Sequence, residues 1–169
     1  TPTWVALAGC YTLWLLAIGV VHAAPSPWDW AWAPLAALAC AFHASLQHEA
    51  LHGHPTRSAA MNEALVFPAF GLLYPYRRFR EMHLRHHDDD RLTDPYDDPE
   101  SWYLAEAQTR ARSAPLRLAL QANRTLLGRM FIGPWLGTWA RVRQDLPGLA
   151  RGDRRLWNAW GRLAVGLAL

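Results

Sequence analysis

The sequence contains only two cysteines, no lysine and no histidine after residue 87. Cys10 and Cys40 both stand inside apolar runs, so we expect them to behave as small buried apolar side chains rather than as a disulfide. Without paired thiols at close spacing, a structural zinc site of the finger type is disfavoured. All 17 basic residues are arginine, which we interpret as a composition bias without mechanistic meaning.

Charged residues are absent from 4–24. At a rise of about 1.5 Å per residue, a helix of this length crosses the hydrocarbon core of a bilayer. No basic residue precedes it, and the apolar run is longer than that of a secretory signal peptide. A buried helix of a soluble protein is the alternative, but such a helix usually keeps a polar face. We therefore predict a membrane span at about 4–24.

A second apolar run, at about 30–48, follows a short turn that is rich in tryptophan and proline. The two runs predict a transmembrane helical hairpin, with the tryptophans of the turn at headgroup level. Arginine is absent from the turn but frequent after residue 54, so the positive-inside rule places the turn outside and the histidine-rich residues on the cytoplasmic side. The predicted fold is an all-α integral membrane protein, and its expected location is a bacterial inner membrane.

The next apolar segment, 64–76, is too short to span a bilayer and contains Pro68. We expect it to form an interfacial or re-entrant segment that returns the chain to the same side of the membrane. The arginines that follow, Arg77, Arg78 and Arg80, are expected to face phosphate headgroups.

Eleven arginines from residue 101 onward predict cytoplasmic or surface helices at 101–150 that contact an anionic bilayer. Nucleic acid, the other partner for such a basic stretch, is disfavoured by the preceding spans. Residues 156–169 predict the start of a third span, in which we expect the sequence to be cut. The whole of 1–169 is predicted to be one domain.

Histidine is concentrated between residues 48 and 87, where six of the chain's eight histidines lie. His48 and His52 are four residues apart, which places both imidazoles on one face of a helix. His83 with His86 and His87 repeats this geometry at spacings of three and four. Imidazole is the commonest protein ligand for metals, and two clusters offer more imidazoles than one four-coordinate ion needs. The pattern predicts a dinuclear site, and iron, zinc, copper and nickel all suit its ligand type.

A second interpretation of the first cluster is the HExxH motif of zinc proteases, in which Glu49 would be the general base. That interpretation leaves the second cluster unexplained, and we do not favour it. His43 precedes His48 by five residues, so we expect it to be packed away from the ligand face. The seven carboxylates of 88–100 are expected to be mostly solvated, with one or two accepting hydrogen bonds from ligand imidazoles.

These motifs resemble those of the membrane fatty acid desaturase and hydroxylase superfamily, which includes carotenoid ketolases and alkane hydroxylases. The resemblance rests on a first box, HxxxH at His48 and His52, and a second box, HxxHH at His83, His86 and His87. The stretches Leu92-Thr93-Asp94-Pro95 and Asp98-Pro99-Glu100-Ser101 are also similar to bacterial members. The resemblance covers about residues 1–105 well and the remainder loosely.

The resemblance implies a non-haem di-iron centre that uses O2 and electrons from a ferredoxin, rubredoxin or cytochrome-type donor to oxidise an unactivated C–H bond. Carried over to this sequence, the implied iron ligands are His48, His52, His83, His86 and His87. Glu49 is expected to orient a ligand, and His54 is either a ligand or a hydrogen-bonding neighbour of one. The family also has a third box after two further spans, and no histidine follows His87. We expect a truncation before that box, with an inactive product as the alternative.

The expected activity is introduction of a double bond into a fatty acyl or related lipid-like substrate. A lipid or alkyl hydroxylase or ketolase with the same boxes is one alternative, and an inactive or zinc-binding membrane protein is another. The expected partners are the lipid bilayer, a lipid-like substrate and the electron donor, without nucleic acid.

Overall fold

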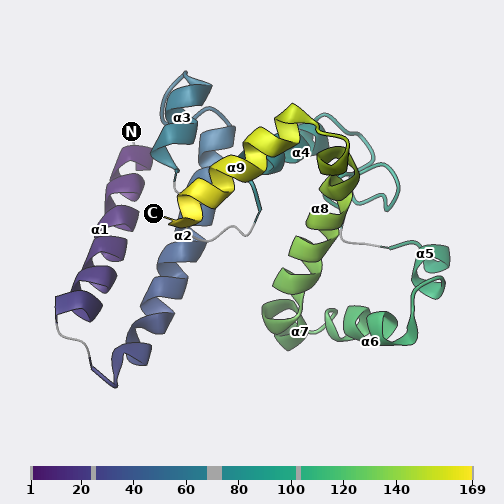
Figure 1. Ribbon diagram of the computed structural model, residues 1–169, viewed down its shortest axis with the longest axis horizontal. Helices are drawn as coiled ribbons and strands as arrows, with labels where there is room; N and C mark the ends of the chain where they lie inside the picture. The colour runs from purple at the N-terminus through teal and green to yellow at the C-terminus, as the bar shows by residue number, and fades with distance from the viewer. Residues whose placement is uncertain (1, 24–25, 68–73, 102–103, 169) are drawn as a thin grey trace. The chain divides into compact units, whose positions relative to one another are not determined.

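The computed structural model describes residues 2–23, 26–67, 74–101 and 104–168 (Figure 1). These ranges are built from helices and their connections and contain no strand, which confirms the all-α prediction. The chain divides into two compact units, the first formed by 1–76 with 161–169 and the second by 77–160.

The first unit contains a long helical pair followed by a short helix. Its elements are α1 (Pro2–Ala23), the 3-10 helix η1 (Asp29–Trp32), α2 (Ala33–Leu51) and α3 (Ala59–Leu65). The second unit contains α4 (Tyr76–His87), α5 (Glu106–Arg110), α6 (Ala114–Ala122), α7 (Leu126–Phe131), α8 (Gly133–Ala150) and the beginning of α9 (Arg154–Ala168).

Helices α1 and α2 lie side by side because apolar side chains from both meet in one core (Figure 1). The buried members of this core are Leu7, Cys10, Leu46, Ala50 and Val66. Two polar side chains attach the chain after α3 to the helical pair. The Tyr11 hydroxyl donates to the Leu65 carbonyl oxygen at 2.6 Å, and the Gln47 amide donates to the Val66 carbonyl oxygen at 3.4 Å. This packing holds the C-terminal part of α2, where the first histidine cluster lies.

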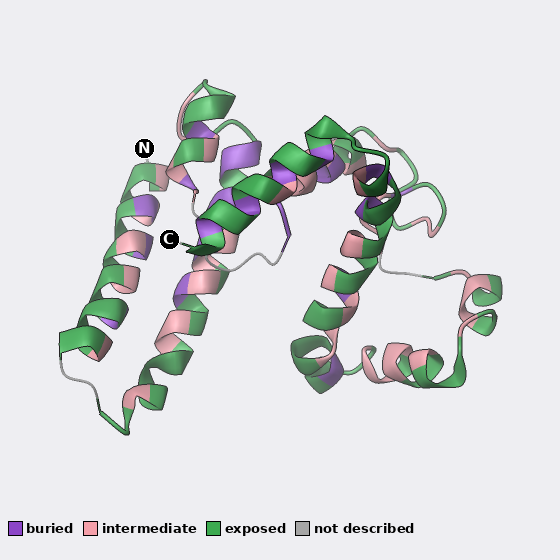
Figure 2. Cartoon of the chain, viewed as in Figure 1, coloured by how far each residue is buried: buried purple, intermediate pink, exposed green. Residues whose placement is uncertain are grey.

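Among the described residues, α1 is the helix that is long and apolar enough to cross a membrane. Its Val5 and Leu15 side chains are 75% and 71% exposed, and Figure 2 shows exposed residues along the helix. Helix α2 ends in a polar segment that includes Gln47, His48 and Glu49, and the same criteria do not confirm the second predicted span.

Helix α9 does not confirm the predicted start of a third span either. It buries one stripe, Leu156, Ala159 and Leu163, and exposes arginines on its other side. Part of the predicted interfacial segment, residues 68–73, lies outside the described residues. Among the described residues neither cysteine forms a disulfide; Cys10 is buried as predicted and Cys40 is half-buried.

Helix α8 has two opposite faces, which follow from its 3.6-residue period. One face carries Gly137, Arg141, Asp145 and Gly148, which are buried or half-buried. The other carries Trp135, Trp139, Arg143 and Leu146, all of which are exposed. The first face packs inside the second unit, where its charged side chains bind α4 and the loop that follows α4.

The step from α6 to α7 depends on Gly128. A Cβ atom at this position would lie 1.8 Å from the carbonyl oxygen of Ala122, so only glycine allows the two helices to approach so closely. The hydroxyl of Thr125 caps α7 by accepting a hydrogen bond from the Gly128 amide at 3.0 Å.

Candidate metal centre

The first histidine pair lies at the C-terminal end of α2. His48 occupies the last turn and His52 caps the helix, and their ring centroids are 4.7 Å apart at an interplanar angle of 66°. The helix ends there because Gly53 has a φ of +91°, a left-handed conformation that favours glycine. His54, beyond this turn, and Glu49, on the helix, are both exposed.

The second cluster lies on the last turns of α4. The ring centroids of His83 and His87 are also 4.7 Å apart, at an interplanar angle of 73°. Their Nε2 atoms approach to 3.0 Å. His86 lies on another face of the helix, with its centroid 5.7 Å from that of His87. The same four-residue spacing on α2 and α4 therefore gives two histidine pairs of nearly the same geometry.

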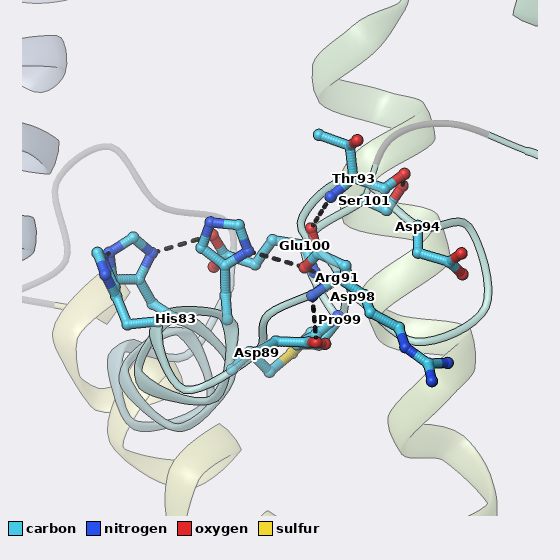
Figure 3. Close-up of polar contacts among 12 residues, drawn as sticks. His83, Asp89, Arg91, Thr93, Asp94, Asp98, Pro99, Glu100 and Ser101 are labelled. Atoms are coloured by element: carbon cyan, nitrogen blue, oxygen red, sulfur yellow. Dashed lines mark hydrogen bonds and ion pairs between the residues drawn. The ribbon is translucent and has the colours of Figure 1, made fainter.

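Two carboxylates of the loop after α4 contact the second cluster (Figure 3). The Glu100 Oε2 atom lies 2.9 Å from the Nδ1 atom of His83, and the Asp98 Oδ1 atom lies 2.8 Å from the Nδ1 atom of His86. Each contact leaves the Nε2 atom of that ring for another partner. The expectation that one or two carboxylates of 88–100 turn toward the imidazoles agrees with these contacts, whereas Asp88, Asp90 and Asp97 are exposed.

The loop is organised around the buried carboxylate of Asp98. Its Oδ1 atom accepts the amide hydrogen of Glu100 and its Oδ2 atom accepts that of Thr93, each at 2.8 Å. Burial alone would raise the pKa of Asp98. The hydrogen bonds from Glu100, Thr93 and His86 outweigh burial and hold this pKa below its usual value. Asp98 is therefore an ionised acceptor for the His86 ring.

Helix α8 supports this arrangement through contacts with both the loop and α4. Arg141 donates to the Pro99 carbonyl oxygen at 2.8 Å, between the two carboxylates that contact histidine. Arg78 binds both oxygens of the buried Asp145, with a shortest distance of 2.8 Å, and Trp160 donates to Asp145 at 3.0 Å. Arg78, expected at lipid headgroups, instead attaches α4 to α8.

The second cluster fits a metal ion by its donor atoms and their separation. A carboxylate can only accept, so the contact with Glu100 places the proton of a neutral His83 on Nδ1 and leaves a lone pair on Nε2. Two nitrogens bound at right angles to one ion at about 2.1 Å are about 3 Å apart. The Nε2 atoms of His83 and His87 have this separation.

A model of the family described as fatty acid desaturase matches residues 25–169. The chain belongs to the fatty acid desaturase family. The search of curated proteins and the search of solved structures found no match. For this desaturase-family chain, the match covers both histidine boxes and the whole of the second unit.

Desaturase-family membership and the histidine clusters indicate an oxidoreductase of the membrane desaturase and hydroxylase type. One apolar helix and the family are consistent with a membrane protein. Among the described residues, His48, His52, His83 and His87 each offer one imidazole nitrogen as a ligand atom. The structure places one pair in each compact unit. The five-histidine ligand set stays a prediction.

Sequence reasoning on this desaturase-family chain did not find Arg141 or Asp145. Asp145 is one of only three carboxylates after residue 101, in a stretch with eleven arginines, and it is 1% exposed. An isolated acid in an apolar, arginine-rich helix was the signal for a buried ion pair. His43 was correctly predicted to be packed. It is buried in an edge-to-face contact with Tyr11, with the two ring centroids 5.9 Å apart.

Proposed function

We propose that this chain is part of an O2-dependent membrane di-iron oxidoreductase that introduces a double bond into a fatty acyl or related lipid-like substrate. The observation that carries the proposal is the 3.0 Å separation of the Nε2 atoms of His83 and His87 in a chain of the fatty acid desaturase family. The matching centroid distance of His48 and His52 supports the same role for the first pair.

The proposed iron ligands are His48, His52, His83, His86 and His87. The two iron ions would supply O2 activation. In desaturation the substrate gives up two hydrogens from adjacent carbons, and these reduce O2 to two water molecules together with two electrons and two protons from outside. The electrons come from a ferredoxin, rubredoxin or cytochrome-type donor. In this chain, the histidines would bind the metal, and the carboxylates of Asp98 and Glu100 would orient His86 and His83.

The proposed location is the membrane, with α1 as a span, a second span within 30–48 and the histidine boxes on the cytoplasmic side. The exposed face of α8 supports contact with the cytoplasmic leaflet. Its tryptophans suit the headgroup region, and Arg143 suits anionic phosphate. These features favour a lipid-like substrate that reaches the site from the bilayer.

Hydroxylation or ketone formation on a similar substrate is the second candidate, because both reactions use the same ligand set and differ in where the substrate carbon is placed. Product analysis distinguishes them. Mass spectrometry of acyl lipids after incubation with the full-length protein, O2 and reduced ferredoxin should show loss of two hydrogens. Gain of one oxygen atom would instead identify a hydroxylase.

Metal analysis of the detergent-purified, full-length protein tests the centre itself. We expect about two iron ions per chain. The His86→Ala variant should lose most of this iron, whereas His22→Ala should retain it, because His22 is exposed on α1 outside both clusters. One zinc ion, or no metal, in the wild-type protein would overturn the proposal in favour of a zinc-binding or non-catalytic membrane protein.

A further inference from the structure

We propose that Asp98 and Glu100 are positioning residues that orient His86 and His83 for metal binding and thereby set the metal affinity of the second histidine box. The inference rests on the proposed function in one respect, namely that these histidines are metal ligands. It extends that function to two acidic residues outside both boxes.

The two carboxylates contact the same ring atom in both histidines. Both contacts are made to Nδ1, at 2.9 Å in His83 and 2.8 Å in His86. A carboxylate accepts but does not donate, so each contact selects the tautomer with hydrogen on Nδ1. The Nε2 atom is then the one that can bind a metal, and the carboxylate fixes the orientation of the ring. The rings of His83 and His86, both on α4, are therefore held in the same tautomer.

Asp98 contacts His86 with a carboxylate that is buried. Its side chain is 1% exposed, and a buried carboxylate is unfavourable unless hydrogen bonds compensate for lost water. Here the loop itself provides two backbone amides, from Thr93 and Glu100. Thr93 adopts a φ of 69°, which is uncommon for a β-branched residue, and its amide donates to Asp98. The backbone is therefore shaped to hold this carboxylate against His86.

The loop that carries Asp98 and Glu100 is held in place by a contact with α8 and by a hydrogen bond within the loop. Arg141 donates to the carbonyl oxygen of Pro99, the residue between the two positioning carboxylates. The hydroxyl of Ser101 donates to the Thr93 carbonyl oxygen at 2.9 Å and closes the loop on itself. Asp97 lies next to Asp98 in sequence, yet it is exposed, and its carboxylate binds Arg91 rather than a histidine. Asp98 and Glu100 therefore direct their carboxylates toward histidine, whereas their neighbour Asp97 does not.

Glu100 provides the sharper experiment, because its carboxylate makes no described contact with the backbone, and its loss should leave the loop folded. Co2+ binding to the full-length protein is followed by its visible absorption, with Fe2+ as competitor. Glu100→Ala should raise the Kd of the site 10- to 100-fold, about the usual effect of removing such a partner. Glu100→Gln keeps an acceptor and loses the charge, so its Kd should lie between those of Glu100→Ala and the wild type, with shifted Co2+ absorption bands.

Asp98→Ala should raise the Kd by a similar factor, and Asp97→Ala is the matched control, expected to bind Co2+ as the wild type does. Circular dichroism checks that each variant keeps its helices. A folded Glu100→Ala protein with wild-type Kd and absorption bands would overturn the inference, as would an equal loss in Asp97→Ala. If the wild-type protein bound neither Co2+ nor Fe2+, the proposed function itself would fail, and the two failures are therefore distinguishable.

Discussion

The Nε2 atoms of His83 and His87 face each other at 3.0 Å on one side of α4. Because Glu100 holds the proton of His83 on Nδ1, the His83 Nε2 atom is an acceptor, and the hydrogen between the two rings comes from His87. A metal ion that binds both rings would replace this hydrogen. The two nitrogens therefore already have about the separation that a shared ion requires.

Metal addition should accordingly stabilise the folded protein. An ion that binds only the folded state stabilises it by about 2.7 kcal/mol at a free concentration 100 times its Kd. We expect the thermal unfolding midpoint to rise when Fe2+ or Co2+ is added and to return when a chelator removes the ion. The measurement is circular dichroism of the detergent-purified protein under anaerobic conditions.

Two variants make this prediction specific. His87→Ala removes one of the facing nitrogens and should abolish most of the metal-dependent rise. His54→Ala should keep the rise, because His54 lies exposed beyond the turn at Gly53 and is not one of the described histidines that cluster on α2 and α4. A loss of the rise in His54→Ala would show that His54 is a ligand, which the sequence alone left open.

The features that could be predicted from the sequence are those with local spacing. A four-residue interval places His48 beside His52 and His83 beside His87 wherever the chain is helical, so both pairs follow from sequence. The contact between Arg78 and Asp145 joins positions 67 residues apart, so the sequence can mark Asp145 as an isolated acid but does not identify its partner. The choice of Asp98 and Glu100 among seven nearby carboxylates depends on the loop backbone, which the sequence alone does not specify.

The predicted spans also differ in how far the local sequence determines them. The first, at 4–24, follows from one uninterrupted apolar run and corresponds to α1. For α9, the sequence shows apolar residues and arginines together. Only the structure shows that Leu156, Ala159 and Leu163 form a buried stripe, whereas the arginines and Trp157, Val165 and Leu167 are exposed. A hydrophobic segment that is amphipathic in three dimensions is difficult to distinguish from a short span by composition.

The ion pair of Arg78 and Asp145 should be important for the stability of the second unit. Asp145 is 1% exposed, and removal of Arg78 leaves its buried carboxylate without a counter-ion, whereas removal of Asp145 leaves Arg78 still paired with Glu81 at 2.5 Å. We expect Arg78→Met to destabilise the protein by about 3–5 kcal/mol and Asp145→Leu to destabilise it less. The double variant should be more stable than Arg78→Met, because it leaves no buried charge unpaired. Urea unfolding of the four proteins measures the difference, and additive effects of the two changes would contradict the pairing.

Substitution of Gly128 tests the close approach of α6 and α7. A Cβ at this position would overlap the Ala122 backbone, which cannot move as a flexible side chain can. Gly128→Ala should therefore lower the thermal midpoint. Gly161→Ala in α9 is the matched control, since nothing lies within 4 Å of its Cβ, and alanine is favoured over glycine in a helix by about 1 kcal/mol. Equal midpoints for the two variants would show that the backbone approach is not restrictive.

The exposed face of α8 is predicted to contact the bilayer surface. Trp139 is 60% exposed there and Arg143 lies one turn further along. A fluorescent NBD label at Trp139→Cys, in a Cys10→Ala and Cys40→Ala background, should emit at shorter wavelength in lipid nanodiscs and be quenched by doxyl-labelled lipid. The same label at Asp97→Cys, in the exposed part of the acidic loop, should report water and remain unquenched.

Arg143→Glu tests the electrostatic part of the same contact. A basic side chain near an anionic surface contributes about 1 kcal/mol, so charge reversal should reduce quenching of the Trp139→Cys label in nanodiscs containing phosphatidylglycerol. In purely zwitterionic nanodiscs the reversal should have little effect, because surface potential is then small. A label at Trp139→Cys that behaves like the label at Asp97→Cys in both lipids would show that this face of α8 does not meet the membrane.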